Sequence, residues 1–273
     1  MDYTLLLPQV IAIAEEVGQL LRAGYGQLQQ VTLKGAVDPV TETDTASETL
    51  ILARLRAAFP DHYIHTEESG GDDWWAVDPV WLIDPLDGTV NFAHNFPHFC
   101  VSMGLLVEKR SVLGVIHDPL RGETFAASLG GGATLNGVPL RVSQTPRLAQ
   151  SLLATGFPYT RRVIADNNTA RLDHFLRRCQ GARRAGSAAL DLAYVAAGRL
   201  DGYWEMQLKP WDIAAGLLLV QEAGGQLSDF TGSADVWNNE IVASNGLIHV
   251  EMLQVLREGA AAPHPDWPLL DEA

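Results

Sequence analysis

The hydrophobic pattern along the chain changes from helical spacing to strand-like runs. Apolar residues recur at three- and four-residue spacing from Leu6 to Leu21, which predicts an amphipathic helix ending near Gly24. A second helix is expected over residues 47–59. The segment 34–44 between these helices is expected to be a loop. The short apolar run 80–83 then predicts a strand buried on both faces.

Further strands and turns follow this run. Strands are expected over 99–107, 112–117 and 124–127, and Asn136-Gly137 is typical of a two-residue hairpin turn. Beyond a polar stretch, 143–150, helices alternate with short strands. These helices are expected over 166–179, 187–197, 211–223 and 248–258, and the strands over 152–154, 202–206, 225–228 and 240–243. We therefore expect two halves, residues 1–145 and 146–259, and a loosely attached extension over 260–273.

Composition and charge narrow the class of protein. With 273 residues of which 47% are hydrophobic, the chain can bury a core and is not disordered. Its 33 acidic and 19 basic residues leave a net charge of -14, which disfavours nucleic-acid binding. Two cysteines, Cys100 and Cys179, are too few for a disulfide framework. The first apolar segment lacks a basic start and contains Pro8, so we expect a cytoplasmic protein without a membrane span.

Acidic residues beside the run 80–83 are candidate metal ligands. Asp84 follows this strand and Asp87-Gly88 reverses the chain, so both carboxylates can point into one crevice. Thr89 opens a short helix whose amide groups can receive an anion. Neighbouring carboxylates repel each other unless a cation lies between them, and Mg²⁺ combines carboxylates, waters and substrate phosphate. The pattern indicates a magnesium site beside an oxyanion site.

Each acidic segment also has a purely structural explanation. Asp84 and Asp87 can serve as turn formers, and Glu67-Glu68 can belong to a solvated loop. Asp212, in the first turn of an apolar helix, stabilises that helix without any metal. Taken one at a time, these residues do not decide between the two explanations.

Several motifs together resemble those of the inositol monophosphatase family. The matching segments are DPVTETD (38–44), HTEES (65–69), WLIDPLDGTVNF (81–92), RRAGSAALDLAYVAAGRLDGYWE (183–205) and PWDIAAGLLLVQEAGG (210–225). The resemblance reaches from near the start to about Glu258, with matching order and spacing. Two positions depart from the family pattern: Thr66 replaces a glycine, and Val90 stands where a second threonine is common. Neither departure removes a ligand.

The resemblance implies a fold and a metal site. The expected fold class is α+β or α/β, a layered αβαβα sandwich of the inositol monophosphatase and fructose-1,6-bisphosphatase type, assembled as a homodimer. Glu67, Asp84 and the Leu86 carbonyl would bind a first Mg²⁺, and Asp84, Asp87 and Asp212 a second. A weaker third ion would attach through Glu67.

It also implies roles in catalysis and substrate binding. Thr89, Asp44 and Glu67 would position the attacking water, while Lys34 and Asp38 would belong to a mobile loop over the metals. The implied contacts to substrate phosphate and alcohol are Asp87, Gly88, Thr89, Gly186, Ser187, Ala188, Glu205 and Asp212. The function that follows is Mg²⁺-dependent, lithium-sensitive hydrolysis of myo-inositol monophosphate or another small phosphorylated polyol. Fructose 1,6-bisphosphate, histidinol phosphate, NADP and adenosine 3',5'-bisphosphate remain alternative substrates.

Other candidate sites carry less weight. Ser187 lacks the G-x-S-x-G setting of a nucleophile, and Pro97 disfavours a zinc pair of His94 and His98. The Arg161-Arg162 and Arg177-Arg178 pairs are expected on solvated faces. Some bacterial proteins similar to this one bind the transcription machinery, and the region of residues 183–184 is then the place for such a contact.

Overall fold

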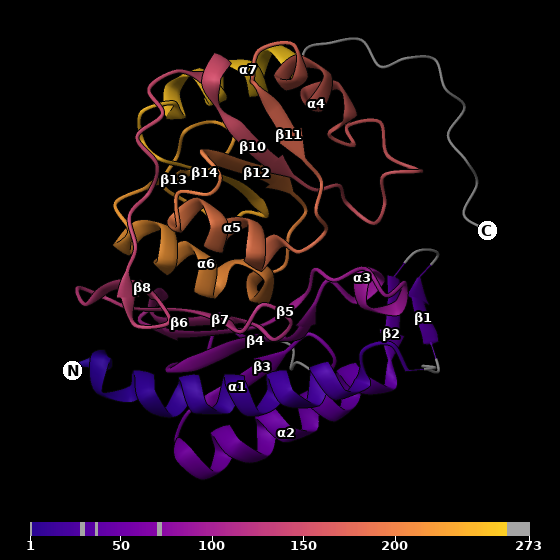
Figure 1. Ribbon diagram of the computed structural model, residues 1–273, viewed down its shortest axis with the longest axis vertical. Coiled ribbons are helices and arrows are strands. Elements are labelled where there is room, and N and C mark those ends of the chain that lie inside the picture. Colours follow the sequence, from indigo (N-terminus) through magenta and orange to yellow (C-terminus); the bar gives the residue numbers. More distant parts are fainter. Residues whose placement is uncertain (1, 28–30, 36–37, 70–72, 261–273) are drawn as a thin grey trace.

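Helices and sheets alternate in five layers. The computed structural model describes residues 2–27, 31–35, 38–69 and 73–260, with the side chains of 31–38 outside that description. From one end of Figure 1 to the other, a helix pair, a sheet, a second helix pair, a second sheet and a third helix pair follow in turn. The predicted αβαβα sandwich is therefore confirmed.

The first sheet has seven strands in sequence order, with one helix pair on its outer face. β3 runs parallel to β4, and every other neighbouring pair is antiparallel. Its strands are β3 (Tyr63–Thr66), β4 (Val80–Asp87), β5 (Cys100–Val107), β6 (Arg110–Asp118), β7 (Glu123–Ser128), β8 (Gly132–Leu135) and β9 (Val138–Pro139). The remaining elements are η1 (Tyr3–Leu6), α1 (Leu7–Gly24), α2 (Glu42–Ala58), the paired strands β1 (Val31–Gly35) and β2 (Asp38–Thr41), and the short α3 (Thr89–Ala93).

The second sheet has five strands in the order β11-β10-β12-β14-β13. These strands are β10 (Leu152–Thr155), β11 (Gly181–Arg183), β12 (Gly202–Met206), β13 (Gln226–Ser228) and β14 (Glu240–Ser244). Helices α5 (Ala188–Ala196) and α6 (Pro210–Glu222) fill the layer between the sheets. Helices α4 (Thr169–Leu176) and α7 (His249–Ala260) cover the outer face, and η2 (Leu148–Gln150) precedes β10.

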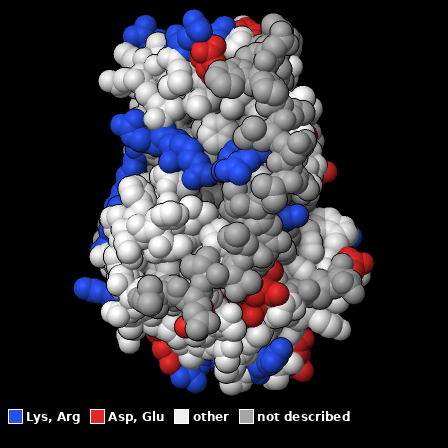
Figure 2. All heavy atoms as spheres, turned by 90° about the vertical axis from the view of Figure 1, so that its right-hand side faces the viewer, with Lys and Arg blue, Asp and Glu red and all other residues white. Residues whose placement is uncertain are grey.

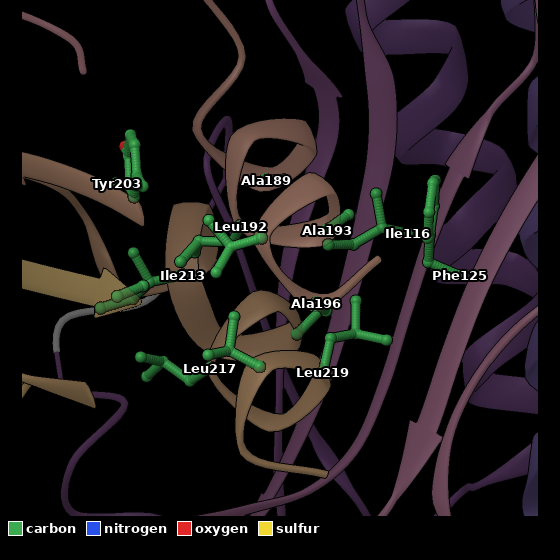
Figure 3. Packing of buried hydrophobic residues seen from close by; sticks show 14 of the residues in the cluster. Ile116, Phe125, Ala189, Leu192, Ala193, Ala196, Tyr203, Ile213, Leu217 and Leu219 are labelled. Atoms are coloured by element: carbon green, nitrogen blue, oxygen red, sulfur yellow. The ribbon is translucent and has the colours of Figure 1, made fainter. Parts of the chain in front are cut away.

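The central core joins the two sheets through α5 and α6. Figure 3 shows Leu192 and Leu217 on these helices and Ile116 on the first sheet, all fully or almost fully buried. A Cβ built on Gly104 would lie 2.6 Å from the Ala214 Cβ, closer than carbon atoms pack. The glycine therefore lets α6 approach β5 closely.

Most predicted elements are present, but two predictions around the start of α2 were wrong. The segment 34–44 is not a loop throughout, because it contains parts of β1 and β2 and the start of α2. α2 begins at Glu42 rather than near Ser47, since Thr41 caps it and the Asp44 side chain accepts a hydrogen bond from the Thr41 amide. The hairpin at Asn136 is confirmed.

The two predicted halves share one central core. The chain leaves the first sheet at Pro139 and enters the second at Leu152, but the central core contains side chains from both halves. The division after residue 145 therefore stays a prediction. The first helix is long and apolar. By length and composition alone, Tyr3–Gly24 could cross a membrane.

In the structure, the apolar face of this helix, including Val10 and Val17, is buried in the core under the first sheet. The extension 261–273 lies outside the described residues.

Candidate active site

The end of β4 forms the centre of the site. The strand does not stop at Ile83 as predicted but continues to Asp87, with an irregularity in its pairing to β5 between Asp84 and Asp87. Such an irregularity changes the direction of the strand and of its side chains, as bulges next to active sites commonly do. Gly88 follows with a φ of 95°, a left-handed conformation that favours glycine, and α3 begins at Thr89.

Four carboxylates from both halves of the chain line one cavity of about 240 Å³. They are Glu67 after β3, Asp84 and Asp87 on β4, and Asp212 in the first turn of α6. Burial raises the pKa of Asp84 well above its usual value, and the charges of the other three carboxylates raise it further. Burial, Glu67 and Asp87 likewise raise the pKa of Asp212. The structure thus brings together acidic side chains separated by up to 145 sequence positions.

One oxygen of Asp84 and one of Asp212 are held by the backbone. The Leu86 amide donates to Asp84 Oδ1 at 2.9 Å, and the Lys209 amide donates to Asp212 Oδ2 at 2.7 Å. Within the described part of the chain, the second oxygen of each carboxylate accepts no hydrogen bond. These oxygens are therefore available to a ligand in the cavity.

Asp87 connects β4 to the second half. Its Oδ2 accepts hydrogen bonds from Ser187 Oγ at 2.5 Å and from the Ala189 amide at 2.8 Å. Burial raises the pKa of Asp87, and these hydrogen bonds oppose that rise because they stabilise the charged form. The carboxylate thus lies at the N-terminus of α5, and the Ser187 hydroxyl is engaged with it.

This set of side chains fits Mg²⁺. Its members are hard oxygen donors, and a divalent cation would relieve the mutual repulsion that raises their pKa values. In residues 2–27, 39–69 and 73–260, no three His, Cys, Asp or Glu side chains already surround one point as metal ligands. The fit therefore rests on the charge and convergence of Glu67, Asp84, Asp87 and Asp212, not on preformed coordination.

Thr89 and Asp44, for which the resemblance implied a role in positioning water, lie side by side. Thr89 Oγ1 is 3.0 Å from Asp44 Oδ1 and 2.9 Å from the Leu86 carbonyl, and its single hydrogen serves one acceptor at a time. Burial raises the pKa of Asp44, while hydrogen bonds from Thr41 and Thr89 oppose the rise.

A buried glutamate holds the segment that carries Glu67. Glu48 Oε1 accepts hydrogen bonds from the Thr66 hydroxyl and from the backbone amide of Ser69, the latter at 3.0 Å. The Glu67 amide also donates to the Ile83 carbonyl at 3.1 Å. Thr66, which stands where the family has glycine, therefore acts in this chain as a hydrogen-bond donor that fastens the loop to α2.

We expect Thr66→Val to destabilise the protein by about 1–2 kcal/mol, because it leaves buried Glu48 without one donor while keeping the side-chain volume. Urea unfolding measures this difference. The matched control is Thr49→Val, which removes an exposed hydroxyl bonded to the Thr45 carbonyl and should change the free energy of unfolding by less than about 0.5 kcal/mol. Equal effects of the two substitutions would contradict a clamping role for Thr66.

The implied substrate contacts belong to the same cavity. Gly186, Ser187, Ala188 and Glu205 line it together with the carboxylates. Burial raises the pKa of Glu205 to about 7, and the Tyr203 hydroxyl, 2.5 Å from Glu205 Oε2, opposes the rise.

Two residues of this region were missed from the sequence. Asp191 on α5 is 2% exposed and lines the cavity, and burial raises its pKa well above the usual value. Its signal was an acidic residue among the apolar residues of that helix. Asn91 Nδ2 donates to the His98 and Ala185 carbonyls at 2.7 and 2.9 Å, which ties α3 to the second half. No local pattern indicated this contact.

The other residues considered in the sequence analysis are the two loop residues, one cysteine and two histidines. Lys34 and Asp38 belong to β1 and β2, and their side chains lie outside the described residues. Cys100 is buried with a raised pKa, as expected of a small hydrophobe. His98 is buried with its pKa lowered by burial to about 4, whereas His94 is exposed.

Comparison with known proteins identifies the family of this chain. The model of the inositol monophosphatase family matches residues 2–261. The chain is 46% identical to an inositol-1-monophosphatase of Synechocystis sp. over 260 residues, covering 94% of this chain and 88% of that protein. It is 43% identical to the Nus factor SuhB of Escherichia coli K12 over 256 residues, covering 93% and 96%. The structure of the inositol monophosphatase from Anabaena (Nostoc) sp. PCC 7120 superposes with a TM-score of 0.85 at 42% identity, covering 93% and 96%. The chain therefore belongs to the inositol monophosphatase family and is a phosphatase of that type.

Proposed function

We propose that the protein hydrolyses small phosphorylated polyols, myo-inositol monophosphate first among them, with Mg²⁺. The observation that carries this proposal is the convergence of Glu67, Asp84, Asp87 and Asp212 in one cavity beside the start of α3. The named inositol-1-monophosphatase relative supports the substrate. Cytoplasmic location and a homodimeric assembly are part of the proposal.

The carboxylates would hold two or three ions. Glu67, Asp84 and the Leu86 carbonyl would bind the first, Asp84, Asp87 and Asp212 the second, and Glu67 a weaker third. When bound, Mg²⁺ lowers the pKa of water and neutralises charge on the leaving oxygen.

The other residues orient the reactants. The amides of Gly88 and Thr89, at the start of α3, receive the phosphate oxygens, and Gly88 has no side chain to obstruct that approach. Asp44 and Glu67 orient the attacking water together with the Thr89 hydroxyl. No residue of this chain forms a covalent intermediate in this mechanism.

The part of the cavity proposed to bind the alcohol of the substrate is lined by polar groups. Glu205 and Ala188 line this part of the cavity, where the Glu205 carboxylate would accept hydrogen bonds from substrate hydroxyl groups. Asp87 and Asp212 face the same space, and Gly186 and Ser187 shape the turn before α5. These groups favour a polyol over an apolar alcohol.

A phosphate-release assay tests the function. The panel contains inositol 1-phosphate, fructose 1,6-bisphosphate, histidinol phosphate, NADP and adenosine 3',5'-bisphosphate. With inositol 1-phosphate, chelation by EDTA should lower the rate at least a hundredfold, added Mg²⁺ should restore it, and Li⁺ should inhibit it. Full activity in EDTA would refute the metal assignment.

Binding to the transcription machinery is a second candidate, because the Escherichia coli relative is named a Nus factor. The surface around Arg183 and Arg184 is the proposed contact. Hydrolysis and binding to purified bacterial RNA polymerase, both measured with an Asp87→Asn variant, distinguish the two functions. The variant should lose hydrolysis and keep polymerase binding if both functions are present.

A further inference from the structure

Asp191 is a buried aspartate of the active-site cavity that the proposed mechanism does not use. It lies in the first turn of α5, three residues after Ala188, and is 2% exposed. It lines the cavity together with Ser187 and Glu205. Acidic side chains at a protein surface are common, and Figure 2 shows Asp and Glu near both ends of the molecule with Lys and Arg beside them. Asp191 differs from these because it is removed from solvent.

The Asp191 carboxylate accepts no hydrogen bond from the described residues. Its backbone amide donates to the Ser187 carbonyl at 3.0 Å, as in any helix. Every other buried aspartate in the described part of the chain accepts at least one hydrogen bond from a side chain or a backbone amide. These are Asp44, Asp84, Asp87, Asp118, Asp201 and Asp229. Because nearly all buried polar groups in proteins are hydrogen-bonded, the exception at Asp191 requires an explanation.

The surroundings do not favour a charge on Asp191. Burial raises the pKa of its carboxyl group, and the charges of Glu205 and Asp87 raise it further, while the charge of Arg184 opposes the rise. None of the ion pairs within 4.0 Å among the described residues includes Asp191. The carboxylate therefore lacks a partner of either kind, a hydrogen-bond donor or a cation.

A structural role at the start of α5 does not account for this residue. An acidic side chain in a first turn stabilises a helix, because it faces the partial positive charge of that end. Ser187 already caps α5, however, since its hydroxyl accepts a hydrogen bond from the Leu190 amide at 3.3 Å. The benefit of a contact with the helix dipole is smaller than the cost of burying a carboxylate without a hydrogen bond.

The neighbouring Glu205 is held in a fixed position. Its Oε2 lies 2.5 Å from the hydroxyl of Tyr203, which is fully buried. A Cβ built on Gly156 would collide with both oxygens of the Glu205 carboxylate, so the absence of a side chain there makes room for them. Asp191 also lines a neighbouring cavity of about 520 Å³, whereas Glu205 does not. The active-site cavity is therefore the space that the two carboxylates share.

We propose that Asp191 is a specificity-determining residue, which accepts a hydrogen bond from a substrate hydroxyl group other than the one that Glu205 binds. This inference rests on the proposed function, since the phosphate must occupy the metal site. A buried carboxylate without a partner in the protein gains one when a hydroxyl group enters the cavity. An alcohol without that hydroxyl group leaves the carboxylate unpaired, and a site of this kind rejects it. The substrate class is thereby narrowed to phosphate esters of polyols with at least two free hydroxyl groups.

Inositol 1-phosphate and cyclohexyl phosphate test this role, because they share one carbon ring and differ in the ring hydroxyl groups. The preference is the ratio of kcat/KM for the first compound to kcat/KM for the second, measured in Mg²⁺. We expect Asp191→Ala to lower this preference by about tenfold or more, through a higher KM for inositol 1-phosphate alone. Asp191→Asn, which keeps an acceptor oxygen, should lower it by less than about threefold.

Thermal unfolding distinguishes a substrate contact from a structural role. Since the Asp191 carboxylate accepts no hydrogen bond from the described residues, Asp191→Ala and Asp191→Asn should keep or raise the Tm. The matched control is Asp201→Ala. The buried Asp201 carboxylate accepts hydrogen bonds from the Ser143 hydroxyl and the Leu152 amide, each at 2.6 Å. This control should lower the Tm by about 5 °C and leave the preference unchanged.

Several results would overturn the role of Asp191. They are an unchanged preference in Asp191→Ala, an equal loss of activity toward both compounds, and equal hydrolysis of both compounds by wild-type protein. Failure of both Asp191 variants to fold, or a Tm lowered as far as in Asp201→Ala, would show a structural role and overturn it as well. All of these results leave the proposed function intact if wild-type protein hydrolyses inositol 1-phosphate. Wild-type protein that hydrolyses no phosphate ester would instead refute the proposed function.

Discussion

Replacing Asp87 by Asn is expected to lower kcat/KM for inositol 1-phosphate by at least a thousandfold. The substitution keeps the shape of the side chain but removes a charge that the proposed second metal ion requires, and a bound ion contributes several kcal/mol to transition-state stabilisation. An Asn oxygen can still accept from Ser187 Oγ and the Ala189 amide, so α5 should keep its position. Phosphate release at saturating Mg²⁺ measures the loss.

The stability of the Asp87→Asn variant shows whether it loses activity through its chemistry or through unfolding. The pKa of Asp87 is raised by burial, so its charge disfavours the folded state when no metal is bound. Asp87→Asn should therefore be at least as stable as wild-type protein in EDTA at pH 7.5. Asp173→Asn, which breaks an exposed ion pair with Arg177, is the control and should keep full activity. More than a tenth of wild-type activity in the Asp87 variant would contradict its assignment as a metal ligand.

Stabilisation by Mg²⁺ should increase as the pH rises from 5 to 7.5. The pKa values of Asp84, Asp87 and Asp212 are raised above that of an unfolded chain, about 3.9. Between the unfolded and folded pKa values the folded protein binds more protons, so metal-free stability falls as pH rises through this window. Mg²⁺ binds the deprotonated carboxylates and competes with those protons, so its contribution grows over the same window.

Thermal unfolding with and without Mg²⁺ measures this effect. At an Mg²⁺ concentration about a hundredfold above its Kd, the expected stabilisation is about 2.7 kcal/mol, or a rise in Tm of about 5–10 °C at pH 7.5. The rise should be clearly smaller at pH 5. Asp212→Asn should reduce both the rise and its dependence on pH. An equal Mg²⁺ shift at pH 5 and pH 7.5 in wild-type protein would contradict a binding site made of these carboxylates.

Local patterns along the chain were sufficient for much of the fold. The spacing of apolar residues predicted α1, and turn residues predicted the hairpin at Asn136 and the reversal at Asp87-Gly88, because these features depend on neighbouring residues. The start of α2 was misplaced because Thr41 and Asp44 form a capping box within a segment that looked like a loop. β11 was missed, since three residues carry too little periodicity.

The active site could be inferred only in part from the sequence, and the rest depended on tertiary packing. The residue types and motif spacing pointed to carboxylates that bind Mg²⁺, but each carboxylate taken alone also suited a turn or a helix start. Only the packing of α6 against β5 brings Asp212 to Asp84 and Asp87, because that contact requires the absence of a side chain at Gly104. Chemistry that resides in single side chains can be inferred from sequence, whereas charge accumulated from distant segments is created by folding.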